Sequence, residues 1–469
     1  MMMLSEIAKN VNGRMVGEDV LCESVGSDSR NIAQNQLFVA IKGEHFDGNS
    51  FALEAIQQGA AAVLVSDANT QAKSAVIVKD TRLALGELAK HWRLQFKLPL
   101  VAITGSNGKT TVKEMLAAIL TATDSNTTAS RSVLATQGNL NNDIGMPMTL
   151  LKMRKEHAFA VIEMGMNHLG EIDYLTHIAQ PTVAVINNAG TAHIGELGSR
   201  DNIAKAKGEI FAGLSRDGIA VINADDAYAG YWKSLNQNKL DNNKKIITFG
   251  LNTKADVTAS YQEVDGVSQV QLSTPNGSID FKLSVLGKHN ISNALAASTC
   301  AVALGISNAD IARGLTGFSA VKGRLQRKAG INGASLIDDT YNANPDSMKA
   351  AIDVLTAQTG STVFVMGDMA ELGADSVKMH AEIGAYAKQK GVAQLLAFGE
   401  LSKHAVAAFG SNGEHFDALE ANIHAARRAM KKGITVLVKG SRFMQMERVV
   451  AALEEKLTEK QLLQKNDGG

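Results

Sequence analysis

The sequence predicts an α/β protein of three domains. Apolar runs of strand length alternate with segments of helical periodicity along most of the chain, a pattern typical of mostly parallel sheets with helices on both faces. At 469 residues the chain is also too long for one ordinary hydrophobic core. We therefore expect a small N-terminal α/β domain over residues 1–82, a central domain with a mostly parallel sheet over 83–317, and a C-terminal Rossmann-like α/β domain over 318–469.

The composition excludes several classes of protein. Lys plus Arg and Asp plus Glu both number 47, so a formal charge of zero gives no general surface for nucleic acid or membrane. Cys22 and Cys300 are isolated, which argues against a disulfide framework or a zinc ribbon. The first residues lack the apolar core of a signal peptide, and no apolar run approaches membrane-spanning length. We expect a cytoplasmic chain, with a monomer as the default state.

The N-terminal domain shows short strands around one helix. Strands are expected at residues 37–41 and 61–65, with a helix over 51–58 that ends at Gly59. The loops at residues 27–30 and 42–49 are dense in polar side chains that suit a charged ligand, although solvated turns are the alternative. A helix over residues 81–96 then leads to Pro99, which marks the entry to the central domain.

The central domain opens with the most informative stretch of the chain, PLVAITGSNGKTTVKEML at residues 99–116. Residues 100–104 form a buried strand, residues 105–108 a turn, and a helix starts at Lys109 with an apolar face at i, i+3, i+4 and i+7. A glycine turn before a helix start collects free backbone N–H groups and the positive end of the helix dipole. Lys109 suits outer phosphates, and the Thr110 hydroxyl suits Mg²⁺. The stretch predicts an ATP site.

This loop is the shorter TGxxGKT form of the phosphate-binding pattern. The longer form has a glycine five residues before Gly108, where this chain has Ile103. An incidental Lys-Thr after a glycine turn is the alternative, but the strand before it and the helix after it favour the phosphate loop.

Further strands of the central domain are expected at residues 159–163, 183–187, 219–223 and 246–249. Ligands of such sheets bind beyond the carboxyl ends of the strands, where Glu163, Asn187 and Asn223 lie. A buried carboxylate needs a partner, and Mg²⁺ beside the phosphate loop would supply one for Glu163. By spacing alone, His193, Lys205 and Lys207 are interpreted as ordinary surface or core residues. Residues 287–290 precede an expected helix that runs through Asn293 to Leu304.

The C-terminal domain repeats the alternation, with strands expected at 335–338, 362–366, 394–398 and 434–438. Asn344 before Pro345 predicts a capped helix start. Polar residues again follow the strands, at 338–342, 367–369 and 439–442. The first turn carries no GxGxxG, which weakens a dinucleotide-binding interpretation.

Together these motifs resemble the Mur ligases, the ATP-dependent amide-forming enzymes of peptidoglycan precursor synthesis. The resemblance covers essentially the whole chain, in the segments ITGSNGKTTVKEM, GNLNNDIGMP, VIEMGMNHLGEI, AKAKGEIF, GKHNISNALAA, DDTYNANPDSM, GDMAELG and VKGSR. The first segment alone marks a superfamily that also includes folylpolyglutamate synthetases. The segments DDTYNANPDSM and GDMAELG resemble the member that adds a dipeptide.

The resemblance implies a role for each matching position. Catalytic residues would be Lys109, Glu163, His193 and Lys207, and the metal ligands Thr110, Glu163, His193 and a carbamylated lysine, with Lys207 the best match and Lys205 the alternative. ATP would be bound by Gly105, Ser106, Asn107, Gly108, Lys109, Thr110, Thr111, His289, Asn290, Asn293, Arg324 and Asp339. The substrates would be bound by Ser29, Arg30, Asp47, Asn49, Asn139, Asn142, Tyr341, Asn342, Lys439, Ser441 and Arg442. Asn49 stands where related ligases often carry His.

The implied reaction joins D-alanyl-D-alanine to UDP-N-acetylmuramoyl-tripeptide with ATP and two Mg²⁺ ions, through an acyl phosphate. The N-terminal domain would bind the UDP-sugar, and the C-terminal domain would close on the nucleotide and bind the dipeptide. The alternatives are another ligase of the superfamily and an ATP-binding protein without phosphoryl transfer. The sequence leaves open whether the third residue of the tripeptide is diaminopimelate or lysine.

Overall fold

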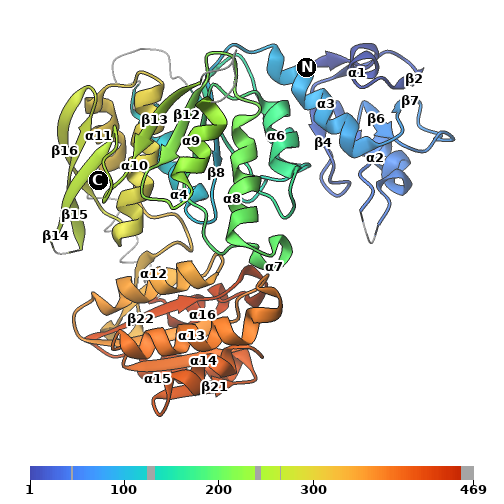
Figure 1. Cartoon of the computed structure of the whole chain (residues 1–469). Coiled ribbons are helices and arrows are strands. Elements are labelled where there is room, and N and C mark those ends of the chain that lie inside the picture. Colours follow the sequence, from blue (N-terminus) through green and yellow to red (C-terminus); the bar gives the residue numbers. More distant parts are fainter. Residues whose placement is uncertain (44–45, 124–131, 238–243, 265, 456–469) are drawn as a thin grey trace, which may run out of the picture.

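The computed structural model describes residues 1–43, 46–123, 132–237, 244–264 and 266–455. Figure 1 shows three bodies in chain order: a small N-terminal unit in blue, a large central unit in green and yellow, and a C-terminal unit in orange and red. The predicted α/β class with three units is confirmed. The exact boundaries at residues 82 and 317 stay predictions.

The N-terminal unit is a five-stranded sheet in the order β2-β7-β6-β5-β4, in which only the β2–β7 pair is antiparallel. A short β1–β3 pair accompanies it. Its elements are β1 (Met2–Met3), α1 (Leu4–Asn10), β2 (Arg14–Gly17), β3 (Leu21–Cys22), β4 (Ser24–Gly26), β5 (Gln36–Val39), the 3₁₀ turn η1 (Gly48–Phe51), α2 (Ala52–Gln57), β6 (Ala62–Val65) and β7 (Ser74–Ile77).

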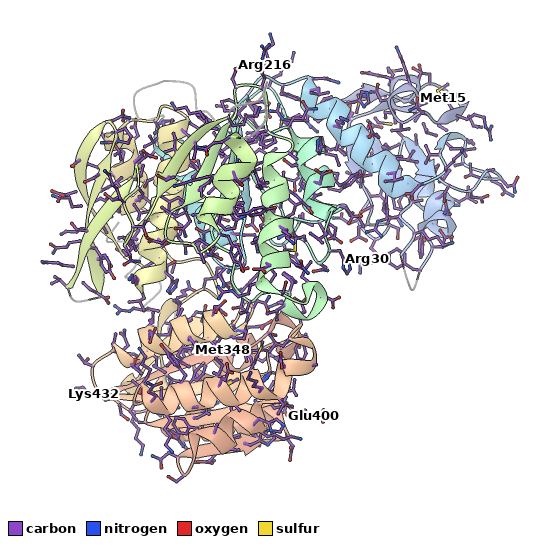
Figure 2. All side chains as sticks on the ribbon, viewed as in Figure 1. Met15, Arg30, Arg216, Met348, Glu400 and Lys432 are labelled. Carbon is purple, nitrogen blue, oxygen red and sulfur yellow. The ribbon has the colours of Figure 1, made fainter. Side chains whose placement is uncertain are left out.

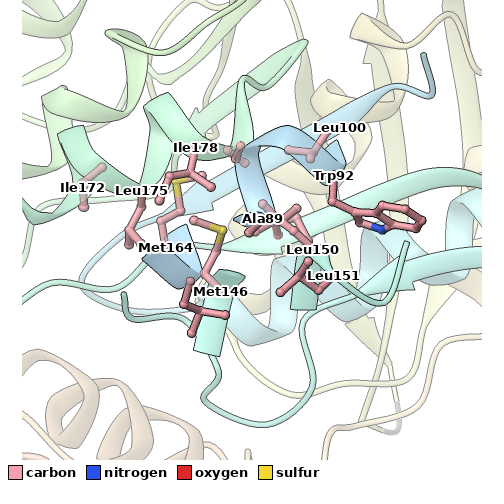
Figure 3. Close-up of a cluster of buried hydrophobic side chains, with 14 of the residues drawn as sticks. Ala89, Trp92, Leu100, Met146, Leu150, Leu151, Met164, Ile172, Leu175 and Ile178 are labelled. Atoms are coloured by element: carbon pink, nitrogen blue, oxygen red, sulfur yellow. The ribbon is translucent and has the colours of Figure 1, made fainter. Parts of the chain in front are cut away.

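Helix α3 (Thr81–Leu94) connects the N-terminal and central units. Its first residue, Thr81, donates to the carbonyl of Ala40 at 2.8 Å. Near its end, Trp92 donates to the carbonyl of Met153 at 3.1 Å. Figure 3 shows Trp92 and Ala89 in one apolar cluster with side chains of the central unit. One hydrophobic core therefore extends through both units.

The central unit is a six-stranded parallel sheet in the order β13-β12-β11-β8-β10-β9. Its elements are β8 (Leu100–Thr104), α4 (Lys109–Ala122), β9 (Ser132–Ala135), α5 (Gly145–Leu150), β10 (His157–Glu163), α6 (Glu171–Ala179), β11 (Val183–Ile186), α7 (Ile194–Leu197), α8 (Arg200–Gly208), η2 (Glu209–Phe211), β12 (Ile219–Asn223), α9 (Ala229–Gln237), β13 (Lys245–Phe249), α10 (Lys288–Ala303) and α11 (Asn308–Thr316). The predicted parallel sheet is confirmed. The five strands predicted at residues 100–104, 159–163, 183–187, 219–223 and 246–249 correspond to β8, β10, β11, β12 and β13.

Strand alternation places helices on both faces of this sheet. In β8, Leu100 and Ala102 pack into one apolar cluster, and Val101 and Ile103 pack into another. The first cluster includes residues of α3, α5, α6, α8 and α9, and the second includes residues of α4, α10 and α11. Strand β8 lies inside the sheet between β11 and β10, so the phosphate loop leaves from a rigid interior strand.

The sequence analysis missed strand β9 of the parallel sheet and a second sheet of the central unit. Strands β14 (Thr258–Val264), β15 (Val267–Thr274) and β16 (Gly277–Leu283) form a separate antiparallel sheet. Val270, Leu272, Phe281 and Leu283 are buried against the α4–α10–α11 face, while alternate residues are exposed. Such half-exposed strands lack the continuous apolar runs that mark buried parallel strands, which is why they escaped detection.

The C-terminal unit is a six-stranded sheet in the order β17-β18-β22-β19-β20-β21, parallel except for β17. Its elements are β17 (Gln326–Ala329), η3 (Ile331–Gly333), β18 (Ser335–Asp339), α12 (Pro345–Thr356), β19 (Ser361–Gly367), η4 (Gly373–Asp375), α13 (Ser376–Gln389), β20 (Gln394–Phe398), α14 (Ser402–Phe409), β21 (Gly413–Phe416), α15 (Leu419–Ala429), β22 (Ile434–Lys439), η5 (Arg442–Met444) and α16 (Glu447–Leu453). The predicted cap is confirmed: Asn344 and Ser347 form a reciprocal capping box, with Pro345 in the first turn.

Figure 1 places α12 on the side of the C-terminal unit that faces the central unit, and Met348 of that helix is labelled in Figure 2. Among the helices of the described chain, none combines the length and apolarity that a membrane span requires.

Candidate active site

The phosphate loop joins β8 to α4 in the predicted way. Gly108 is the N-cap of α4 with a φ of +81°, and the helix start has no side-chain cap. The first amides of an α-helix have no intrahelical partner, so the start of α4 offers N–H donors. The Lys109 ammonium donates to the carbonyl of Gly105 at 2.7 Å. Burial lowers the pKa of Lys109, while Glu163 opposes that effect.

Asparagine side chains hold this loop in place. The Asn187 amide donates to the carbonyl of Asn107 and to Asn293 Oδ1, both at 2.9 Å. Asn293 in turn donates to Asn290 Oδ1 at 3.0 Å. A Cβ at position 108 would clash with the Asn293 and Asn187 amides, so the loop requires glycine there. Asn290 and Asn293 therefore support the loop from helix α10.

Glu163 ends β10 and is 1% exposed. Its Oε1 has no hydrogen-bond partner. The ammonium of Lys113, which is equally buried, lies 3.8 Å from that oxygen, donates to the carbonyl of Thr136 and pairs with Glu114 at 2.7 Å. The Glu163 carboxylate is thus held near a cation, with one oxygen unused.

The residues present fit a magnesium ion. Glu163 and Thr110 both line the same cavity and offer the hard oxygen ligands that Mg²⁺ prefers. Over the residues that the structure describes, no three His, Cys, Asp or Glu side chains gather as a metal site. Mg²⁺ usually takes only one or two carboxylates and completes its shell with water and substrate phosphates. The unused Glu163 oxygen beside a phosphate loop matches that kind of site.

His193 precedes α7 in a left-handed conformation, with a φ of +61°. Its Nδ1 lies 2.7 Å from a carboxylate oxygen of Glu371, a residue of the C-terminal unit. The separation is that of a hydrogen bond, although the ring N–H does not point straight at the oxygen. The side chain of His193 lines the cavity.

Lys207 and Lys205 differ sharply although both lie on α8. Lys207 is 2% exposed, and Lys205 is exposed to solvent. Burial, together with the nearby Lys109 ammonium, holds the pKa of Lys207 well below its usual value. Lys207 therefore has the environment of a neutral amine, which Lys205 lacks.

Among the described residues, four side chains of the C-terminal unit contact the phosphate loop and the loop after β11. Arg324 donates to the Thr110 hydroxyl at 2.9 Å, and Asn344 donates to Asn107 Oδ1 at 2.8 Å. Asp346 accepts from the backbone N–H and the hydroxyl of Thr191 at 2.7 and 2.9 Å. The fourth contact joins His193 and Glu371. The guanidinium of Arg324 also lies over the ring of Tyr341, 4.2 Å from its centre.

A cavity of about 1140 Å³ lies between the central and C-terminal units. The predicted site residues that line it are Ser106, Asn107, Gly108, Lys109, Thr110, Thr111, Asn139, Asn142, Glu163, His193, His289, Asn290, Asn293, Arg324, Asp339, Tyr341, Asn342, Lys439 and Arg442. An adjoining cavity of about 490 Å³ shares His289, whose pKa is lowered by burial.

Other predicted residues lie outside the cavity wall: Gly105, Lys207, Ser441 and the N-terminal set Ser29, Arg30, Asp47 and Asn49. Figure 2 shows Arg30 at the edge of the N-terminal unit, where it pairs with Asp28 at 2.8 Å. Asn49 donates to Asp47 and to Ser66 at 2.7 and 2.9 Å. Residues 44 and 45 of the second predicted loop lie outside the described residues.

Two predicted substrate residues of the C-terminal unit are engaged inside it. The Lys439 ammonium lies 2.6 Å from Asp339 and donates to the carbonyl of Asn342 at 2.8 Å. The Ser441 hydroxyl, 1% exposed, accepts from the backbone N–H of Ala370 at 2.8 Å. Arg442 is more available, since 64% of its side chain is exposed despite an ion pair with Glu447 at 3.0 Å.

Sequence reasoning missed several residues of the cavity wall, including Arg200, Asp346 and Glu371. The last two lie in segments that carried the family resemblance, DDTYNANPDSM and GDMAELG. Their contacts join residues far apart in the chain, so the segments marked them without indicating what they contact.

Family models match the chain in three places. They are described as Mur ligase family, catalytic domain, over residues 22–93; Mur ligase middle domain, over 103–301; and Mur ligase, glutamate ligase domain, over 323–442. A relative from Escherichia coli K12, named UDP-N-acetylmuramoyl-tripeptide–D-alanyl-D-alanine ligase, is 44% identical over 96% of this chain and 98% of its own. A Bacillus subtilis relative of the same name is 37% identical over the same shares.

Solved structures agree with these relatives. The crystal structure of MurF from Acinetobacter baumannii has a TM-score of 0.88 at 37% identity, covering 97% of this chain and 98% of that one. MurF ligase from Thermotoga maritima in complex with ADP has a TM-score of 0.82 at 28% identity, covering 96% and 100%. A folylpolyglutamate synthase of Mycobacterium tuberculosis shares the fold at 18% identity, with a TM-score of 0.63.

Proposed function

The chain belongs to the Mur ligase family, and we propose that it performs the step for which its relatives are named. It joins D-alanyl-D-alanine to UDP-N-acetylmuramoyl-tripeptide in an ATP-dependent ligation of peptidoglycan precursor synthesis. ATP and a UDP-linked precursor point to the cytoplasm as the place of this reaction, and one chain contains all three units, which is consistent with a monomer.

One observation carries the proposal: a single cavity holds both the phosphate loop and the segment DDTYNANPDSM of the C-terminal unit. A nucleotide alone would not need a cavity of about 1140 Å³. A ligase must hold the nucleotide, a carboxylate and an amine together, so the volume and the two-sided wall suit ligation.

The central unit would bind the triphosphate. The loop from Gly105 to Thr111 offers backbone donors at the start of α4, and Lys109 exchanges the carbonyl of Gly105 for a phosphate oxygen. Thr110 and Glu163 would hold one Mg²⁺, and His193 and Lys207 a second. These ions would neutralise the approaching phosphoryl and carboxylate oxygens. Thr110 must first release Arg324, which then becomes free to reach the phosphates.

We propose Lys207 rather than Lys205 as the carbamylated lysine. Carbamate formation requires a neutral amine that attacks CO₂, and burial favours the neutral form of Lys207. The product is an anionic oxygen ligand in place of a cation. Lys205 is exposed to solvent and lacks this buried environment.

Some residues of the C-terminal unit would contact the substrates, and others would hold those residues in place. Arg442 is the exposed cation that would bind the carboxylate of the incoming dipeptide. Lys439 would act indirectly, because it fixes Asp339 and the backbone of Asn342 on the cavity wall. His289 and Asp339 would face the base and ribose. Asn139, Asn142 and Tyr341 would face the peptide, and the loops with Ser29, Arg30, Asp47 and Asn49 would bind the UDP-sugar.

The chemistry would proceed in two steps. The terminal carboxylate of the tripeptide attacks the γ-phosphorus of ATP, which releases ADP and leaves an acyl phosphate. Lys109 and the amides at the start of α4 stabilise the charge on the transferring group. The free amine of D-alanyl-D-alanine then attacks the acyl carbon, and the tetrahedral adduct expels phosphate. The C-terminal unit excludes water that would hydrolyse the acyl phosphate.

Phosphate release by the purified chain tests this function. We expect release only with ATP, Mg²⁺, UDP-N-acetylmuramoyl-tripeptide and D-alanyl-D-alanine together, with the pentapeptide product seen by mass spectrometry. Parallel assays with diaminopimelate and lysine tripeptides establish the third residue. Release with a shorter UDP-linked substrate and a single amino acid would move the chain to another step, and absence of turnover despite ATP binding would refute ligation.

A further inference from the structure

The contact between His193 and Glu371 joins two strained residues across the two units. His193 has a φ of +61° and Glu371 a φ of +62°, a conformation that residues with a Cβ rarely adopt. Their side chains meet at 2.7 Å. Strained backbone persists where the surroundings enforce it, and it gathers at functional sites. Two such residues in direct contact therefore call for an explanation.

The neighbours of Glu371 fix its position. The backbone N–H of Met369 donates to His380 Nε2 at 2.9 Å, and that of Ala370 donates to the Ser441 hydroxyl at 2.8 Å. The carbonyl of Glu371 accepts from the backbone N–H of Gly195 at 3.0 Å. Gly195 and Gly373 approach so closely that a Cβ on Gly195 would clash with the backbone of residue 373. Residue 371 is thus attached to α7 by its backbone as well as by its carboxylate.

The chemistry of a histidine ligand gives this arrangement a purpose. A neutral imidazole carries one N–H, so donation from Nδ1 leaves the lone pair on Nε2. Metal-bound histidines nearly always donate their other N–H to a carboxylate, a carbonyl or water, which fixes the tautomer and the ring orientation. Among the described residues, Glu371 supplies the carboxylate nearest to His193, and it belongs to a different unit.

We propose that Glu371 is a positioning residue for His193, and that docking of the C-terminal unit thereby completes the second divalent-cation site. With the ion bound, the Nδ1–H would turn onto the Glu371 carboxylate 2.7 Å away and donate to it, which orients the ring and leaves Nε2 for the ion. The inference rests on the proposed function, since His193 was assigned to the metal there. It adds that the site becomes complete only when the C-terminal unit is docked.

Manganese binding measured by electron paramagnetic resonance tests the inference without relying on turnover. The full-length chain would be titrated with Mn²⁺ in the presence of a non-hydrolysable ATP analogue and UDP-N-acetylmuramoyl-tripeptide. For Glu371→Ala we expect the affinity for the second ion to fall about 10–100-fold, the effect of losing such a partner. The first ion and the nucleotide should bind as before. Glu371→Gln keeps an acceptor oxygen and should recover most of the loss.

Asp346→Ala is the matched control. It removes another contact between the two units, to Thr191, without touching the imidazole of His193. If Glu371 orients the ring, this variant should weaken the second ion much less than Glu371→Ala does. Equal weakening by both variants would show that docking alone matters and would overturn the positioning role.

An unchanged second ion in Glu371→Ala would also overturn the inference, and so would failure of Glu371→Gln to bind better than the alanine variant. The unmodified chain distinguishes this failure from failure of the proposed function. If it forms the pentapeptide while Glu371→Ala keeps its second ion, only the inference is refuted. If it forms no product, the proposed function is refuted as well.

Discussion

The central and C-terminal sheets share one architecture but treat their polar residues in opposite ways. Both are mainly parallel, and both place polar side chains after the strands that face the cavity. In the central unit, Glu163 at the end of β10 keeps an oxygen without a hydrogen-bond partner, and Lys207 on α8 is a buried amine. After the C-terminal strands, Asp339 pairs with Lys439 at 2.6 Å, and Asp368 accepts from two backbone N–H groups.

This difference separates polar residues that are available to bind a ligand from polar residues that stabilise the cavity wall. A buried polar group without a hydrogen-bond partner costs stability, and on the wall of the cavity, as for Glu163, such a group is available to a ligand. A fully paired group is already used by the fold. The C-terminal sheet reaches the cavity through a few projecting residues instead, namely Arg324, Asn344, Asp346 and Glu371. Substitutions in the two sheets should therefore have different consequences.

The largest effect on stability is expected from Lys439→Met. The Lys439 and Asp339 side chains are 3% and 13% exposed, so the substitution leaves a nearly buried carboxylate without its cation. We expect the free energy of unfolding of the C-terminal unit to fall by roughly 3–5 kcal/mol, measured by urea titration with circular dichroism.

Lys390→Met tests the part played by burial. Lys390 pairs with Asp353 at the same 2.6 Å, but these side chains are 40% and 49% exposed. Solvent screens an exposed pair, so we expect a much smaller loss of stability than from Lys439→Met. Equal losses from both substitutions would contradict the importance assigned to burial of the Lys439–Asp339 pair.

In the central unit, Lys207→Met should reduce activity without reducing stability. The substitution removes a buried amine without removing volume, so we expect the melting temperature to be unchanged or higher in CO₂-depleted buffer. Ligase kcat/KM should fall roughly 10²–10³-fold, the size seen when one preorganised electrostatic contact is lost. Lys205→Met, on the exposed side of the same helix, is the control and should change neither quantity. A marked loss of stability in Lys207→Met would place this lysine among the structural residues.

The same contrast explains what the sequence could predict. The phosphate loop is local: strand, turn and helix start lie within residues 99–116, and the structure places them as expected. The cap of α12 at Asn344 is local too. The pairing of His193 with Glu371, and the support of Gly108 by Asn293, join distant parts of the chain. The periodicity of a sequence does not indicate contacts between distant residues. The half-exposed strands β14–β16 have no continuous apolar run from which they could be predicted.

An intermediate effect is expected from Gly108→Ala, which should reduce both the stability of the protein and its affinity for ATP. The alanine would adopt a strained φ near +81° and would also clash with the amides of Asn187 and Asn293. Gly391→Ala isolates the first part, because Gly391 has a φ of +84° and open space around it. We expect the control to cost about 1 kcal/mol in thermal unfolding. Gly108→Ala should cost more and weaken ATP binding in calorimetry; equal costs would show that the asparagines simply move away.

The smallest effect concerns His380, which is buried in the C-terminal unit and holds the segment before Glu371. Its Nε2 accepts from the backbone N–H of Met369 at 2.9 Å, which requires a neutral ring, and burial lowers its pKa below the usual 6.5. The unfolded chain therefore takes up the proton first as the pH falls. This contribution to stability is complete above pH 6.5 and is lost between 6.5 and the lower pKa of the folded state, with a slope of at most about 1.4 kcal/mol per pH unit. His380→Gln keeps an acceptor and cannot titrate, so its unfolding free energy should vary less with pH over this range. If the unfolding free energies of the unmodified protein and His380→Gln changed equally with pH, His380 would contribute nothing to the pH dependence of stability.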